Sequence, residues 1–163
     1  RAALTGLAGE DVRVIATYNG REPVPPVSVP ANAVLVPWLS YSQTMPSCDL
    51  VVAHGGHGTL MRALASGCPV VTTDCGGPSE YLTEGKTGFI VPIGNPQAIA
   101  HRIGLLLSDS ALRERLSTSA RREAENRYSY ARMIAELTSI YHSALQSASP
   151  HSAVTPHAAM LAG

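Results

Sequence analysis

The 163 residues include 12 basic and 12 acidic side chains, so the formal net charge at pH 7 is zero. This balance argues against a nucleic-acid-binding surface and a polybasic membrane patch, and no apolar run approaches the ~20 residues that span a bilayer. The length suffices for one compact domain with a core. The three cysteines form no Cys-x-x-Cys pair and the start has no signal-peptide pattern, which favours reduced thiols in a cytoplasmic protein.

Short apolar strands alternate with loops and helices through the first part of the chain. The predicted strands cover residues 11–18, 33–38, 49–54, 68–74 and 89–92. A loop rich in Pro and Gly follows the first strand, and a short helix follows the second. The helix HGTLMRALAS follows the third strand, and a glycine-rich loop around one helical turn follows the fourth.

Three helices are predicted after the last strand. We expect Asn95 to cap the first, with Pro96 at its first position, and Asp109 and Ser129 to cap the other two. Each helix has apolar residues on one face: Ile99, Ile103, Leu106 and Leu107 on the first, Leu112 and Leu116 on the second, and Met133, Ile134, Leu137, Ile140 and Tyr141 on the third. Residues 147–163 have no period, which predicts a disordered tail.

The alternation of strands and helices predicts an α/β fold, a parallel sheet flanked by helices on both faces, in one domain over residues 1–146. Ligands of such sheets bind beyond the carboxyl ends of the strands. The sequence His-Gly-Gly-His-Gly-Thr lies at one of these ends, between the third predicted strand and its helix. This placement is the first indication of function.

The glycine loop has the properties of an anion site. Gly55, Gly56 and Gly58 lack a Cβ, so main-chain N–H groups can approach a ligand closely. The loop opens a helix, whose first N–H groups are unpaired and whose dipole favours an anion. Thr59 can add a hydroxyl, and His54 can donate from its ring or carry a charge near about pH 6.5. These features suit a phosphate or diphosphate; the alternative is a tight turn whose glycines serve packing alone.

Several common motifs are absent from the sequence. There is no GxxxxGK[ST] and no GxGxxG after the first strand, which argues against a P-loop nucleotidase and a dinucleotide-binding fold. No GxSxG is present, so the usual serine-hydrolase elbow is excluded. His54 and His57 are three residues apart but have no evident third partner, so we expect no metal site.

Two parts of the chain resemble two groups of glycosyltransferases. Residues 36–71, from VPW to PVV, resemble the donor-binding half of macrolide- and plant-type UDP-sugar glycosyltransferases, through a W-x-P-Q-like segment, H-G-G-x-G-T and G-x-P. The following residues resemble glycosyl transferases group 1, which includes sucrose and glycogen synthases and many mannosyltransferases. The motifs are G-G-x-x-E, E-G-K-T-G and G-N-P, at residues 76–80, 84–88 and 94–96. Both groups share the GT-B architecture of two Rossmann-like domains, so the chain resembles a hybrid of two donor-binding C-terminal domains.

The resemblance implies roles for individual residues. The diphosphate of a nucleotide sugar would be held by His54, Gly55, Gly56, Gly58 and Thr59. Trp38 would stack on the base, and Gly77 and Glu80 would line the sugar pocket, where the Glu80 carboxylate can accept hydrogen bonds from hydroxyls. The alternatives are a core aromatic for Trp38 and a first-turn acid favoured by the helix dipole for Glu80. Arg62 stands where the first group often has an acidic residue that holds the ribose, so that role is lost or altered.

The expected function is therefore donor binding for glycosyl transfer from a nucleotide sugar, with a UDP-sugar as the expected donor. In both groups the catalytic base, which deprotonates the acceptor hydroxyl, and the acceptor pocket belong to an N-terminal domain. No catalytic residue is therefore assigned in this chain. The expected partners are that domain or a separate acceptor-binding chain, with no nucleic acid and with membrane contact only through a partner. No metal or other cofactor is expected. Two alternatives stay open: the donor-binding subunit of a two-chain glycosyltransferase, and a non-catalytic fragment.

Overall fold

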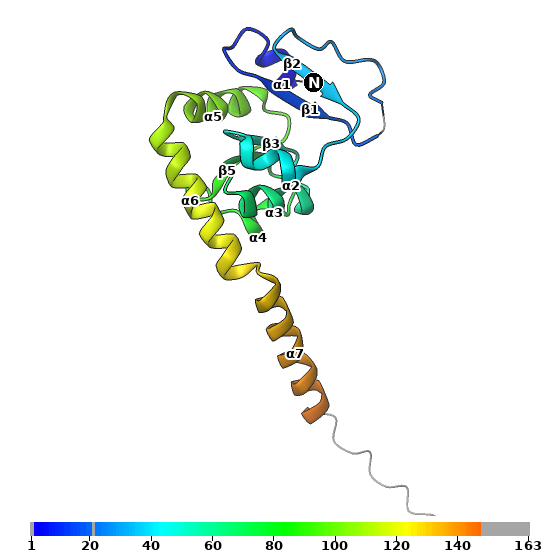
Figure 1. Ribbon diagram of the computed structural model, residues 1–163, viewed down its shortest axis with the longest axis vertical. Coiled ribbons are helices and arrows are strands. Elements are labelled where there is room, and N and C mark those ends of the chain that lie inside the picture. The colour runs from blue at the N-terminus through cyan, green and yellow to red at the C-terminus, as the bar shows by residue number, and fades with distance from the viewer. Residues whose placement is uncertain (1, 21, 148–163) are drawn as a thin grey trace, which may run out of the picture. The chain divides into compact units, whose positions relative to one another are not determined.

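The computed structural model describes residues 2–20 and 22–147 and divides the chain into two compact units, residues 1–128 and 129–163 (Figure 1). The first unit contains the five strands found among these described residues: β1 (Val14–Thr17), β2 (Ala33–Val36), β3 (Val51–Ala53), β4 (Val70–Thr73) and β5 (Gly88–Val91). Each lies within or overlaps a predicted strand. All pairings are parallel, as predicted.

The strands form two parallel sheets where the sequence predicted one. One sheet pairs β1 with β2, and the other has the order β3-β4-β5. In the second sheet, Val51 lies opposite Val70, and Val71 lies opposite Phe89. Pairing order depends on contacts far apart in sequence, which is why the pattern of apolar runs could not reveal the division.

Six α-helices and one 3-10 turn belong to the first unit among the described residues: α1 (Ala2–Gly6), α2 (Tyr41–Thr44), η1 (Met45–Ser47), α3 (His57–Ser66), α4 (Pro78–Tyr81), α5 (Pro96–Ser108) and α6 (Ser110–Arg127). The sequence analysis predicted all of them except α1. The segments α2 and η1 together occupy the place of the single short helix that was expected. The fold class is thus α/β, with parallel sheets flanked by helices.

Two apolar clusters cover opposite faces of the three-stranded sheet. Val70 packs in one cluster with Leu60 and Leu64 of α3, and its neighbour Val71 packs in the other with Leu106 of α5. Because adjacent residues in a strand point to opposite faces, this division places α3 and α5 on opposite sides of β4. All five side chains are fully buried. The sheet therefore separates α3 from α5, with one helix on each face.

The predicted capping of α5 and α6 is confirmed. The Asn95 side chain accepts a hydrogen bond from the Ala98 amide at 2.9 Å, with Pro96 at the first helical position. Asp109 accepts one from the Leu112 amide at 2.8 Å. Each cap satisfies an N–H group that the helix itself cannot pair.

The second unit contains α7 (Tyr130–Ser147), which confirms the third predicted helix. Ser129 Oγ accepts a hydrogen bond from the Arg132 amide at 3.4 Å, as expected of its cap. No side chain of α7 is buried, so the predicted apolar stripe is exposed. The disordered tail predicted for residues 147–163 lies outside the described residues, except for Ser147. One domain over residues 1–146 stays a prediction, since the compact units divide after Tyr128.

The described part of the chain contains no helix of the length and apolar character required to cross a membrane.

Replacement of Asn95 by Ala should lower the free energy of unfolding by about 1 kcal/mol, because the Ala98 amide loses its acceptor. Chemical denaturation monitored by circular dichroism measures the change. Gln97→Ala is the matched control, since Gln97 is an exposed residue of the same helical turn and should shift stability by no more than about 0.5 kcal/mol. Equal effects of the two substitutions would show that the cap contributes nothing.

Candidate functional site

The turn from β3 into α3 is fixed by Gly55. Its φ of +101° lies in the left-handed region, which residues with a Cβ rarely adopt. A Cβ at this position would overlap Cys75 Sγ and lie 2.9 Å from Pro78 Cγ and 3.0 Å from the Thr73 carbonyl oxygen. Gly55 is therefore required by packing against the loop that follows β4.

The turn leaves four successive amide groups unpaired. Among the residues that the structure describes, the N–H groups of residues 55–58 donate to no protein acceptor, whereas the amides of Thr59 and Leu60 both donate to the Gly56 carbonyl at 3.1 Å. Gly56 is the N-cap of α3 and has no side chain to cap it. The positive end of the helix dipole adds to these donors, so the turn favours an anion.

Gly58 differs from Gly55 in its surroundings. A Cβ added to Gly58 would meet no atom within 4 Å, and the residue is exposed in the first turn of α3. Packing within the described chain thus gives no reason for glycine here. The open space lies directly beside the unpaired amides.

His54 lies exposed at the carboxyl end of β3. Its carbonyl oxygen accepts a hydrogen bond from Thr73 Oγ1 at 3.0 Å, which ties the loop to the end of β4. A Cβ on Gly56 would lie 3.1 Å from His54 Nε2, so the imidazole ring lies against the glycine loop. A ring nitrogen is therefore close to the unpaired amides.

The glycine loop is one wall of the site, and the loop after β4 forms the second wall. The Asp74 carboxylate accepts a hydrogen bond from the Gly76 amide at 3.3 Å, and Gly77 is the N-cap of α4. Glu80 is exposed in the first turn of α4, with a carboxylate that has no ion-pair partner among the described residues. The Tyr128 hydroxyl donates to the Glu80 carbonyl at 3.2 Å and so holds α4 against the end of α6.

Sequence reasoning missed an aromatic contact that joins the two walls. The ring of His57, at the start of α3, lies 4.7 Å from the ring of Tyr81, and the ring of Tyr81 lies 6.1 Å from that of Tyr128. Desolvation, and then the charge of Glu80, raise the pKa of the Tyr81 hydroxyl. The sequence analysis gave His57 no role as a ligand, and no local pattern signals a contact between these rings.

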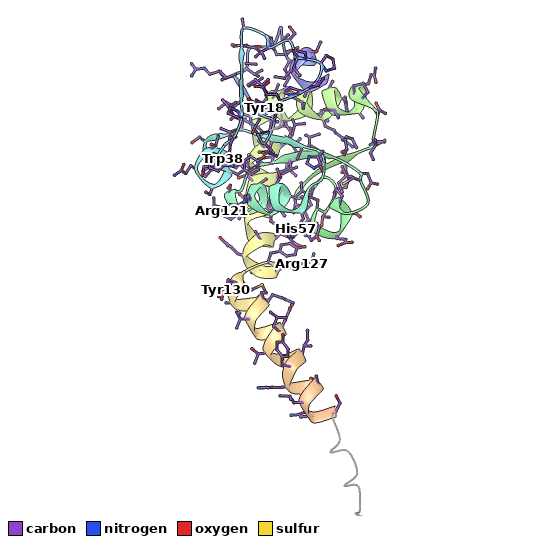
Figure 2. The ribbon with its side chains drawn as sticks, turned by 90° about the vertical axis from the view of Figure 1, so that its right-hand side faces the viewer. Tyr18, Trp38, His57, Arg121, Arg127 and Tyr130 are labelled. Carbon is purple, nitrogen blue, oxygen red and sulfur yellow. The ribbon has the colours of Figure 1, made fainter. Side chains whose placement is uncertain are left out.

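Trp38 follows β2 and is 69% exposed, so it is not a core aromatic. Figure 2 shows Trp38 apart from His57. Thr59 is half-buried in the first turn of α3. The structure thus brings His54, Gly55, Gly56, Gly58 and Thr59 together, places Gly77 and Glu80 on the adjacent loop, and leaves Trp38 separate.

Two cavities lie away from the glycine loop. One of about 340 Å³ lies between α1 and α5, and the other, of about 410 Å³, lies near the amino-terminal ends of β3 and β4, lined by polar residues that include Arg113 and Arg121. Neither cavity is lined by residues of the glycine loop. No group of three or more His, Cys, Asp or Glu side chains in the described chain could hold a metal ion.

Parallel strands, helices on both faces and a glycine loop at a strand end define a Rossmann-like α/β domain. The sequence profile of the family glycosyl transferases group 1 matches residues 41–123, which is 83 of the 163 residues. The chain therefore belongs to this family. The matched residues extend on both sides of Val71, after which the second of the two resemblances was expected to begin.

Similar proteins support the same assignment. Spore coat protein SA of Bacillus subtilis is 44% identical over 81 residues, which is 49% of this chain and 22% of that protein. The glycosyltransferase SnogD from Streptomyces nogalater has a TM-score of 0.61 and 29% identity, over 76% of this chain and 32% of SnogD. HepE of Anabaena in complex with UDP has a TM-score of 0.58 and 27% identity, over 62% of this chain and 29% of HepE. The chain thus spans between about a fifth and a third of the length of these proteins.

Gly55 and Gly58 form a matched pair for a test of this geometry. Gly55→Ala should lower the free energy of unfolding by about 1–3 kcal/mol, because it combines a strained φ with overlap at Cys75. Gly58→Ala should leave stability unchanged or raise it by up to about 1 kcal/mol, because alanine favours the helix and meets no atom. Urea denaturation of both variants gives the comparison, and a Gly58→Ala protein as unstable as Gly55→Ala would contradict it.

Proposed function

We propose that the chain is the donor-binding domain of a glycosyltransferase and that its glycine loop holds the diphosphate of a nucleotide sugar. The observation that carries this proposal is the row of four unpaired amides, residues 55–58, at the carboxyl end of β3. A diphosphate is an anion with several acceptor oxygens, and amides at a helix N-terminus match it in charge and in hydrogen bonding. Membership of the family supports the same function.

The proposed chemistry concerns the leaving group. When the bond to the sugar breaks, negative charge develops on the nucleoside diphosphate, and fixed donors stabilise that charge without reorganisation. The amides of residues 55–58 and the ring of His54 are the donors available at the loop. The Tyr81 contact with His57 restrains the adjacent α4 and thereby limits movement of the second wall.

The nucleobase and the sugar of the donor would bind on either side of the diphosphate. We assign the sugar hydroxyls to the exposed Glu80 carboxylate beside Gly77, since a carboxylate accepts hydrogen bonds from hydroxyl groups. We assign the base to Trp38, whose exposed ring offers a face for stacking. The UDP bound by HepE, which shares the fold and 27% identity, supports uridine as the nucleoside.

Glycosyl transfer also requires an acceptor hydroxyl and, in inverting enzymes, a base that removes its proton. The proposal assigns neither to this chain, so both would come from other polypeptide, either a further domain or a separate acceptor-binding chain. A cytoplasmic location stays a prediction.

The function is tested by calorimetric titration with UDP, GDP and ADP. The chain should bind UDP, and His54→Ala should weaken binding at least tenfold, about 1.4 kcal/mol, because the imidazole lies against the loop. His101→Ala is the control, since His101 is exposed on α5 and should leave the affinity unchanged. Absence of binding by all three nucleotides, from a folded chain, would contradict the proposal and favour a non-catalytic fragment.

The absence of a metal requirement is a second part of the proposal, argued from the amide donors that face the anion. Replacement of saturating magnesium by excess EDTA should change the UDP dissociation constant by less than about threefold, which is ~0.65 kcal/mol. Titration under both conditions measures the change. A loss of binding in EDTA would show that a cation, rather than the amides, balances the diphosphate charge.

A further inference from the structure

The helix α4 is a single turn whose two ends are fixed by packing. Pro78, at its first position, is buried and lies against Gly55, and Leu82, directly after the turn, is 4% exposed. Within the turn, the Glu80 amide donates to the Gly77 carbonyl at 3.0 Å. Isolated helices of fewer than about 12 residues are marginal in water, so contacts from outside α4 are needed to fix the exposed Glu80 between the two buried ends.

Tyr128, at the end of α6, makes such a contact. Its hydroxyl donates to the Glu80 carbonyl at 3.2 Å, and its ring lies edge-on to that of Tyr81, with 62° between the planes. The Arg127 guanidinium lies 5.3 Å from the centre of the Tyr128 ring and forms an ion pair with Glu123 at 2.7 Å. The side chain of Tyr128 is therefore held by α6 on one side and by α4 on the other.

The helix that carries Tyr128 also supports the glycine loop. Ala120 of α6 is fully buried in the same apolar cluster as Leu60 of α3, the helix that the glycine loop opens. Because both helices pack in one close-packed core, Tyr128 and the unpaired amides are fixed relative to each other. The hydrogen bond from Tyr128 therefore sets the position of Glu80 relative to these amides.

Tyr81 continues the contact from α4 to the glycine loop. Its ring lies 4.7 Å from the ring of His57, whose amide is one of the four unpaired amides. Desolvation, and then the nearby Glu80 carboxylate, raise the pKa of the Tyr81 hydroxyl. Both parts of Glu80 are thus restrained, the side chain beside Tyr81 and the main chain by Tyr128.

We propose that Tyr128 is a positioning residue for the sugar of the donor. Through the Glu80 carbonyl it holds α4 at one distance from the glycine loop, so that the Glu80 carboxylate meets sugar hydroxyls while the diphosphate occupies the amides of residues 55–58. Tyr128 touches neither group and acts through Glu80. The inference rests on the proposed function, which assigns the diphosphate and the sugar to the two walls of the site.

This role separates two affinities that a purely structural residue would change together. UDP has the diphosphate without the sugar, so its binding should depend on the amides and not on Glu80 or Tyr128. UDP-glucose adds the hydroxyl groups that the Glu80 carboxylate would accept hydrogen bonds from. Removal of the Tyr128 hydroxyl should therefore weaken the binding of UDP-glucose and leave that of UDP in place.

The test is calorimetric titration of UDP and UDP-glucose into the wild type, Tyr128→Phe, Glu80→Ala and the double variant. Tyr128→Phe should weaken UDP-glucose at least about fivefold and UDP less than about twofold, the size expected for one hydrogen bond. Phenylalanine keeps the ring beside Tyr81, so the fold should be retained, which urea denaturation checks. Tyr130→Phe is the matched control, since Tyr130 is 75% exposed on α7 and should change neither affinity.

The double variant shows whether Tyr128 acts through Glu80. Glu80→Ala removes the carboxylate but keeps the carbonyl that Tyr128 holds, so Glu80→Ala alone should weaken UDP-glucose at least about fivefold, and Tyr128→Phe should add less than about twofold to that loss. A full additional loss in the double variant would mean that Tyr128 supports the site by another route and would overturn the inference.

Three further results would overturn it: equal losses of UDP and UDP-glucose affinity in Tyr128→Phe, no loss of either in that variant, or UDP-glucose binding that Glu80→Ala leaves unchanged. In each of these cases, UDP binding by the wild type leaves the assignment of the diphosphate to the glycine loop in place. No binding of UDP by the folded wild type would instead contradict the proposed function, and the inference with it.

Discussion

The contact between Gly55 and the loop after β4 is the constraint on which the site depends. Gly55 fits beneath Cys75 and Pro78 only because it has no Cβ, and its positive φ turns the chain from β3 into α3 within a few residues. The Thr73 hydroxyl secures the same point from β4 through the His54 carbonyl. As a result, the amides of residues 55–58 donate to no protein acceptor among the described residues. A donor array of this kind needs a fixed backbone, since mobile amides would lose entropy on each binding event.

The glycines of the loop serve two separate purposes. Gly55 satisfies packing, whereas Gly58 has open space around it and serves no contact within the described chain. This difference answers the alternative that all the glycines exist for a tight turn. Gly55 does, whereas Gly58 leaves open space beside unpaired amides. The aromatic contact of His57 with Tyr81 then joins the loop to α4, so the two walls of the site form one connected surface.

Local chemistry made much of the fold predictable. Asn95 and Asp109 cap α5 and α6 as their side chains and the following residues indicated, because a cap depends on a few consecutive residues. The glycine loop was located for the same reason. The helix α1 was missed, since five residues carry too little periodicity for a helix to be predicted. The division into two sheets and the Tyr81 contact depend on residues far apart in the chain, and no local pattern contains that information. The exposure of Trp38 likewise follows from tertiary structure.

The central claim is that the amides of the β3–α3 turn bind the diphosphate. It is tested most directly by an NMR titration of the ¹⁵N-labelled chain with UDP, with uridine in parallel. The account predicts that the amide resonances of Gly55, Gly56, His57 and Gly58 shift together and saturate at one UDP concentration, while uridine, which lacks the phosphates, leaves them in place. Saturable shifts confined to other residues, with these four amides unmoved, would contradict it.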